Sequence, residues 1–175
     1  MNNGTIIVYT GNGKGKTTSA IGTGLRAYGQ GLKVLMLQFI KGTWKYGELE
    51  AIRKLAPDFK IEPLGMGFIG VGGKPITAEE RQNIRDSWER MKREVMSDKY
   101  DMIILDEINY VVGYGLLPVE EVLELLEKKP ARLHLILTGR GAHAKIIEKA
   151  DIVTEMREIK HHYAEGTEAQ KGIEF

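Results

Sequence analysis

The sequence contains no cysteine in its 175 residues. That absence excludes disulfide bonds, thiolate metal sites and cysteine nucleophiles, and it fits a reducing compartment. No apolar stretch approaches the length of a membrane span, and residues 1–4 have no signal-peptide character. We therefore expect a cytoplasmic protein with no membrane partner.

The sequence also has no marked excess of basic over acidic residues, or of acidic over basic ones. Lysine and arginine number 25 against 24 acidic residues, which gives a formal net charge of +1. Because the basic residues are spread along the chain, we expect no nucleic-acid partner. The length and the apolar fraction of 42% are ordinary for a globular protein, and they predict a single domain over residues 1–175.

What the sequence does contain is a glycine-rich turn between an apolar strand and a helix-forming segment. This order predicts a phosphate-binding loop, in which backbone N–H groups and the positive end of the helix bind phosphate. Lys16 adds a full positive charge, and the Thr17 hydroxyl can ligate Mg²⁺. The loop is one residue shorter than the usual G-x-x-x-x-G-K-[ST], because Thr10 stands where the first glycine would fall. The turn reads Thr10-Gly11-Asn12-Gly13-Lys14-Gly15-Lys16-Thr17-Thr18.

Strands alternate with helices along the rest of the chain. We predict strands over residues 5–10, 33–39, 60–64, 102–107, 133–137 and 152–156, and helices over 16–28, 48–56, 77–97, 118–128 and 142–149. The alternation predicts an α/β, single-domain, RecA-like P-loop NTPase fold, with a mainly parallel sheet and helices on both faces. Ligands of such sheets bind at the carboxyl ends of the strands, where the glycine loop, Asp106-Glu107 and Thr138-Gly139-Arg140 all fall.

A pair of acids ends the most apolar strand. Met102-Ile103-Ile104-Leu105 is followed directly by Asp106 and Glu107. Beside a phosphate loop, this order is typical of the Walker-B arrangement, in which a carboxylate holds Mg²⁺ opposite Thr17, directly or through water. The pattern leaves both acids open as the ligand, and in a hydrolytic ATPase the second acid would polarise water instead.

Three other features of the sequence bear on a possible site: Arg140, the histidine pair 161–162 and Phe68. Arg140 can place its guanidinium on phosphate or ribose oxygens, or it can be a surface arginine. The adjacent His161 and His162 do not share a face of a strand or a helix, so we predict no metal site there. Phe68 lies in the glycine-rich stretch 65–73, and composition alone favours a core position for its ring.

Several blocks together resemble the P-loop type of ATP:corrinoid adenosyltransferase, a family that acts on cob(I)alamin or cob(I)yrinic acid a,c-diamide. The blocks run in family order over nearly the whole chain, and the family shares the shortened loop. They are residues 9–18 (Tyr9 to Thr18), Gln38-Phe39-Ile40-Lys41-Gly42, Leu105-Asp106-Glu107, Thr138-Gly139-Arg140-Gly141, Glu155-Met156-Arg157-Glu158-Ile159-Lys160-His161 and Gln170-Lys171-Gly172-Ile173-Glu174.

The resemblance implies adenosyl transfer rather than hydrolysis. A Co(I) corrinoid would attack the 5′ carbon of ATP, form a Co–C bond and expel tripolyphosphate. Thr17 and Glu107 would hold Mg²⁺, which stabilises the leaving group. The catalytic residues would be Lys16, Glu107 and Phe68. The residues binding the nucleotide would be Gly11, Asn12, Gly13, Lys14, Gly15, Lys16, Thr17, Thr18 and Arg140.

The resemblance also bears on the corrinoid and on partners. The family commonly has Gly-Phe-Thr-Trp in its glycine loop, with aromatics that press on the corrin, whereas this chain reads Gly67-Phe68-Ile69-Gly70. Phe68 is therefore kept, and Gly70 replaces the tryptophan. The resemblance further implies ATP bound in reversed orientation, a homodimer, an electron-donating flavoprotein, and cobalamin, cobinamide or cobyrinic acid diamide as the corrinoid.

Two other functions fit the phosphate loop by itself. One is a P-loop ATPase that acts as a binding switch or nucleic-acid motor, with Glu107 as the hydrolytic acid. The other is a small-molecule kinase that transfers the γ-phosphate to a hydroxyl group. The identity of the product distinguishes all three reactions.

Overall fold

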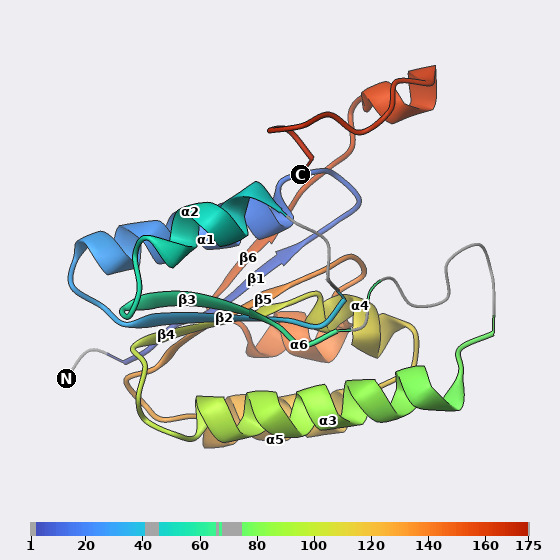
Figure 1. Ribbon diagram of the computed structural model, residues 1–175. Helices are drawn as coiled ribbons and strands as arrows, with labels where there is room; N and C mark the ends of the chain where they lie inside the picture. Colours follow the sequence, from blue (N-terminus) through green and yellow to red (C-terminus); the bar gives the residue numbers. More distant parts are fainter. Residues whose placement is uncertain (1–2, 41–45, 66, 68–74, 175) are drawn as a thin grey trace.

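A parallel sheet forms the centre of the protein in the computed structural model, which describes residues 3–40, 46–65, 67 and 75–174. The six strands of this sheet are β1 (Ile6–Thr10), β2 (Val34–Gln38), β3 (Phe59–Pro63), β4 (Met102–Asp106), β5 (His134–Thr138) and β6 (Ile152–Glu155). Their order is β3-β2-β4-β5-β1-β6, with every pair parallel (Figure 1). All carboxyl ends therefore lie at one edge, and β5 lies between the strand of the phosphate loop and the strand of the acids.

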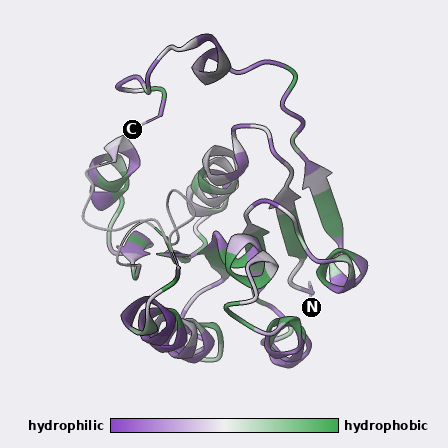
Figure 2. Ribbon diagram, turned by 90° about the vertical axis from the view of Figure 1, so that its right-hand side faces the viewer, coloured by the Kyte–Doolittle hydropathy of each residue, from purple (hydrophilic) through white to green (hydrophobic). Residues whose placement is uncertain are grey.

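Helices cover both faces of this sheet. On one face lie α1 (Lys16–Gly29) and α2 (Gly47–Arg53), and on the other lie α3 (Ala78–Val95), α4 (Ile108–Gly113), α5 (Val119–Lys128) and α6 (Ala144–Lys149) (Figure 1). Successive side chains of each strand point to opposite faces of the sheet and so enter two separate hydrophobic cores. In β2, Val34 and Met36 face α1, while Leu35 and Leu37 face α3. Figure 2 shows the strands and inner helix faces as mainly hydrophobic and the outer helix faces as hydrophilic. The predicted α/β fold is confirmed.

Every predicted strand and helix has a counterpart in the structure, with ends that differ by a few residues. A capping box at Thr77 begins α3, since Glu80 N donates to Thr77 Oγ1 at 3.1 Å and Thr77 N donates to Glu80 Oε2 at 2.7 Å. Two short elements were not predicted: α4 and the 3₁₀ helix η2 (His162–Glu165). In the described part of the chain, no helix combines the length and apolarity needed to cross a membrane.

Helix α1, which carries the phosphate loop at its start, lies unusually close to the sheet. A Cβ on Gly24 would meet Phe59 Cζ at 2.9 Å and Ile104 Cδ1 at 3.3 Å. Both neighbours are fully buried, so neither ring nor methyl group can move aside easily. Glycine at this position therefore sets how closely α1 approaches β3 and β4.

We expect Gly24→Ala to lower the free energy of unfolding by about 1–3 kcal/mol, because overpacking outweighs the gain in helix propensity. Gly22→Ala is the matched control on the same helix, since a Cβ there meets nothing within 4 Å. That variant should gain roughly 0.5–1 kcal/mol. Urea unfolding measures both, and equal stability of the two variants would refute the close packing.

Candidate functional site

The phosphate loop connects β1 to α1 through two glycines with left-handed backbones. Gly11 has φ 93° and Gly15 has φ 110°, a region that favours glycine. Gly15 is the residue before α1, so the helix begins at Lys16 and its first N–H groups face the space above the loop. The predicted strand–loop–helix order is therefore present in the geometry of an anion-binding turn.

The first half of the loop packs against the segment that follows β6. Gly13 N donates to Met156 O at 2.7 Å. A Cβ on Gly11 would lie 2.4 Å from Met156 O, and one on Gly13 would lie 2.7 Å from Arg157 O. These glycines are thus required by backbone contact with residues 156–157, in addition to anything the loop binds.

Thr10, which stands where the usual spacing has glycine, has a structural role of its own. Its side chain is 7% exposed, and Thr10 Oγ1 accepts a hydrogen bond from Ala142 N at 3.0 Å. The bond ties the end of β1 to the segment just after Arg140. At the position where the usual spacing has a glycine, this chain therefore has a hydroxyl group that anchors the loop after β5.

Lys16 lies inside the loop with its amine turned onto the backbone. Its Nζ donates to Gly13 O at 2.7 Å, and the residue is 8% exposed. Burial lowers the pKa of Lys16, and the nearby negative charge of Glu107 acts in the opposite direction. A buried amine beside an anion-binding turn is stabilised in its charged form when a phosphate enters.

The carboxylate of Asp106 is the centre of a hydrogen-bond network that joins several strands to the loop. Thr17 Oγ1 donates to Asp106 Oδ1 at 3.0 Å, and Thr138 Oγ1 donates to the same oxygen at 2.6 Å. Gln38 Nε2 donates to Asp106 Oδ2 at 3.1 Å. Asp106 is 0% exposed, so these bonds replace its hydration.

Glu107 has a strained backbone that turns its side chain away from this network. It adopts φ 66° and ψ 16°, which is rare for a residue with a side chain and costs on the order of 1–3 kcal/mol. Glu107 N donates to Thr138 Oγ1 at 2.9 Å, which holds the turn. The two neighbouring acids therefore separate: Asp106 is buried below the loop, and Glu107 borders the open space above it.

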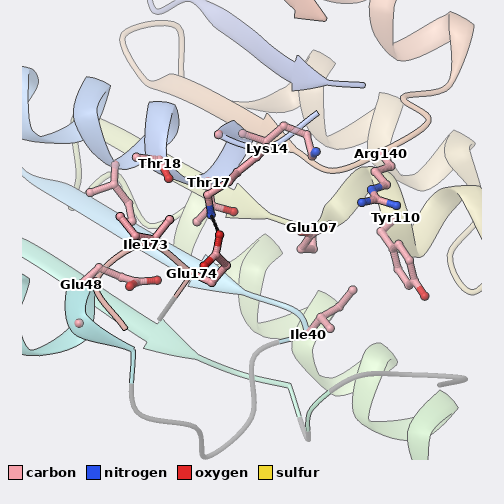
Figure 3. Close-up of a pocket in the computed structure, with 15 residues that line it drawn as sticks. Lys14, Thr17, Thr18, Ile40, Glu48, Glu107, Tyr110, Arg140, Ile173 and Glu174 are labelled. Atoms are coloured by element: carbon pink, nitrogen blue, oxygen red, sulfur yellow. Dashed lines mark ion pairs between the residues drawn. The ribbon is translucent and has the colours of Figure 1, made fainter. Parts of the chain in front are cut away.

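That space is a cavity of about 740 Å³ at the carboxyl edge of the sheet. Figure 3 shows Arg140 and Tyr110 at one end, Ile173 and Glu48 at the other, and Thr17 and Glu174 between them. The cavity is lined by residues of the loop, of α1, of α4, of the segment around α2 and of the chain's end: Lys14, Gly15, Lys16, Thr17, Thr18, Ile21, Ile40, Gly47, Glu48, Glu107, Tyr110, Arg140, Gly172, Ile173 and Glu174.

The C-terminal segment folds back over the phosphate loop. Glu174 Oε1 lies 3.5 Å from Lys14 Nζ, an ion pair marked in Figure 3. The backbone N–H of Gln170 donates to Glu174 Oε2 at 2.8 Å, and this bond, with Lys14, holds the pKa of Glu174 below its usual value. An ionised carboxylate therefore occupies a cavity whose loop is built to bind an anion.

The predicted site residues do not all line the cavity. Lys14, Gly15, Lys16, Thr17, Thr18, Glu107 and Arg140 line the cavity. Gly11 and Gly13 lie behind it against residues 156–157, and the exposed Asn12 is not among the lining residues. Phe68, predicted as catalytic, lies outside the described residues. His161 and His162 form no metal cluster within the described ranges, and His162 Nε2 lies 3.9 Å from Glu174 Oε1.

The donors at the loop suit a hard cation such as Mg²⁺. Because Thr17 donates its proton to Asp106, its oxygen lone pairs are left for a ligand, and Glu107 supplies a carboxylate at the cavity wall. In the described part of the chain, no three His, Cys, Asp or Glu residues gather as a metal cage. This pattern fits a magnesium ion that takes its other ligands from phosphate and water.

The hydrogen-bond network of Asp106 with Thr17, Gln38 and Thr138 was not predicted, although the sequence contained a signal for it. Gln38, Asp106 and Thr138 are each the last residue of an apolar strand, and a fourth polar residue, Thr10, ends β1. In a parallel sheet such residues meet at one edge. Glu174 gave no comparable signal, because its contact with Lys14 depends on how the chain's end folds back.

Comparisons with known proteins agree with this geometry. The family model described as ATP:corrinoid adenosyltransferase BtuR/CobO/CobP matches residues 2–175. A corrinoid adenosyltransferase of Escherichia coli K12 is 43% identical over 98% of this chain and 86% of its own length. The corrinoid adenosyltransferase CobA of Salmonella typhimurium LT2 is 41% identical over the same shares. Among solved structures, the KaiC-like protein PH0186 of Pyrococcus horikoshii OT3 matches with a TM-score of 0.53 and 16% identity, over 91% of this chain and 76% of that one, which shows the fold alone.

We expect Glu174→Gln to tighten the binding of ATP about fivefold at low salt, because it removes a negative charge from the anion-binding cavity. Calorimetric titration with ATP measures the change, which should shrink as ionic strength rises. Glu165→Gln is the matched control, since this acid of the same segment pairs with Lys160 and does not line the cavity. Weaker ATP binding by Glu174→Gln would contradict the competition between the carboxylate and phosphate.

Proposed function

The chain belongs to the ATP:corrinoid adenosyltransferase family, and we propose that its cavity holds ATP with the 5′ carbon, rather than the γ-phosphorus, exposed to attack. The enzyme transfers the 5′-deoxyadenosyl group of ATP to the Co(I) centre of a corrinoid and releases tripolyphosphate. The electron pair of Co(I) forms the Co–C bond, and the pair of the C5′–O bond leaves on the phosphate oxygen. The observation that carries this function is the family match, which spans every residue of the site.

The cationic side chains of the cavity would stabilise the leaving tripolyphosphate. Lys16 would exchange its bond to Gly13 O for a phosphate oxygen, and Lys14 would exchange Glu174 for phosphate. Arg140, at the other end of the cavity, would place its guanidinium on phosphate or ribose oxygens. Such preorganised charges act on the negative charge that develops as the C5′–O bond breaks.

Magnesium would be held by Thr17 and Glu107, with Asp106 fixing the Thr17 hydroxyl from below. Bound there, the ion neutralises charge on the departing phosphates. Asp106 already accepts bonds from Thr17, Thr138 and Gln38, which favours Glu107 as the carboxylate that faces the ion. The strained backbone of Glu107 supports this role, since it is what brings that carboxylate to the cavity wall.

The proposed orientation of ATP is the reversed one that the family resemblance implies, and the two ends of the cavity support it. In most P-loop enzymes the γ-phosphate lies toward the Walker-B acid. Here the attacked carbon must lie where a bulky corrinoid can approach, and we propose the end bordered by Tyr110, Glu107 and the exposed Arg140, whose guanidinium can meet ribose oxygens. We therefore place the ribose near Glu107 and the γ-phosphate toward Thr18, which is the reversed orientation.

The remaining expectations stay predictions. They are a homodimer, an electron-donating flavoprotein, a cytoplasmic location, a role for Phe68 against the corrin, and the choice among cobalamin, cobinamide and cobyrinic acid diamide. The ATPase and kinase alternatives are not favoured, because the relatives that cover almost the whole chain are named as adenosyltransferases.

The function is tested by anaerobic incubation with Mg·ATP and a chemically reduced corrinoid. We expect a Co–C product whose absorbance spectrum reverts on illumination. Lys16→Ala should slow product formation at least about 100-fold, because it removes a charge that acts on the leaving group. Lys145→Ala is the control, since Lys145 pairs with Glu120 on the surface.

Metal dependence completes this test. Chelation by EDTA should abolish product formation, and added Mg²⁺ should restore it. Formation of ADP and phosphate in the absence of corrinoid, with no photolabile product in its presence, would overturn the assignment.

A further inference from the structure

Two tyrosines form a stacked pair at the Arg140 end of the cavity (Figure 3). The rings of Tyr110 and Tyr114 have centroids 4.2 Å apart and planes inclined by 27°. Tyr110 lies in α4 and Tyr114 is its C-cap residue, whose N–H donates to Tyr110 O at 3.0 Å, so the i,i+4 spacing places both rings on one side of the helix. Tyr110 lines the cavity, whereas Tyr114 is 59% exposed, so the pair extends from the cavity wall to solvent.

The position of this pair relative to the catalytic groups is fixed by the backbone. Helix α4 begins directly after Glu107, and Val111 N donates to Glu107 O at 3.2 Å. On its other side, Gly139 approaches so closely that a Cβ would lie 2.9 Å from Tyr110 N. The aromatic pair is therefore held rigidly beside Glu107 and the loop that carries Arg140.

The neutral aromatic rings of Tyr110 and Tyr114 are suited to contact a flat, uncharged part of a ligand. Burial and a hydrogen bond to Tyr114 raise the pKa of Tyr110 to about 12, so its ring stays neutral at physiological pH. Aromatic faces favour planar conjugated partners, and the phenol groups can bond to amides at the edge of such a partner. The triphosphate end of the cavity has the opposite character, with Lys14 and Lys16.

We propose that the Tyr110–Tyr114 pair is a contact surface for the corrin macrocycle, which it positions at the Arg140 end of the cavity beside Glu107. This inference rests on the proposed function and adds residues to it. With ATP bound in the cavity, the second, larger substrate would have to approach from the rim. Tyr114, as the exposed member, would make the outer contact, and Tyr110 would support it from the cavity wall.

Equilibrium binding of hydroxocobalamin, followed by absorbance without reductant or ATP, tests the pair independently of turnover. Tyr114→Ala should raise the Kd for the corrinoid about three- to tenfold, whereas Tyr114→Phe should bind almost as tightly as the unmodified chain. The Kd for ATP should stay within about twofold for both variants. Leu25→Ala is the control for loss of an exposed apolar side chain, because Leu25 is 50% exposed on α1 and does not line the cavity.

Each outcome decides the proposal. A raised Kd for ATP with unchanged corrinoid binding would show that the pair faces adenine and would overturn it. Unchanged binding of both ligands by Tyr114→Ala would also overturn it, since the pair would then only stabilise α4. Failure of the proposed function looks different: the unmodified chain would bind no corrinoid and form no Co–C product.

Discussion

The site depends on one buried carboxylate. Asp106 accepts hydrogen bonds from Thr17, Thr138 and Gln38, and so ties the first turn of α1 to the ends of β2, β4 and β5. Because the Thr17 hydroxyl donates its proton to Asp106, its lone pairs are left for a ligand in the cavity that Thr17 lines. The same network holds the turn at Glu107 through Thr138. Removing this buried acceptor would leave several polar groups without partners, which is costly in a dry interior.

A second constraint is the balance of charge in the cavity. Lys14, Lys16 and Arg140 line it together with Glu48, Glu107 and Glu174. A cavity of mixed charge can hold ATP tightly only if some of the acids take a cation or move aside. Glu107 suits the first role, because its backbone brings it to the wall beside Thr17, and Glu174 suits the second, because it lies in a terminal segment held by an ion pair and short-range bonds.

The sequence was sufficient for the features that depend on local pattern. The alternation of strands and helices, the glycine loop and the acids after β4 are all local, and the structure contains them. Helix α4 was missed because its six residues, Ile108–Gly113, are too few to show a helical period, and the left-handed turn at Glu107 had no signal in the sequence. The roles of Thr10 and Glu174 depend on contacts with Ala142 and Lys14, far along the chain, which only the folded structure brings together.

The central claim is that this loop presents the 5′ carbon of ATP, so the bond that breaks joins carbon to oxygen and leaves the phosphate chain intact. Phosphorus-31 NMR of a complete anaerobic reaction, quenched before any secondary hydrolysis, tests it most directly. We expect intact linear tripolyphosphate, formed in the same amount as the Co–C product. The appearance of ADP with inorganic phosphate, or of AMP with pyrophosphate, as the primary products would contradict it.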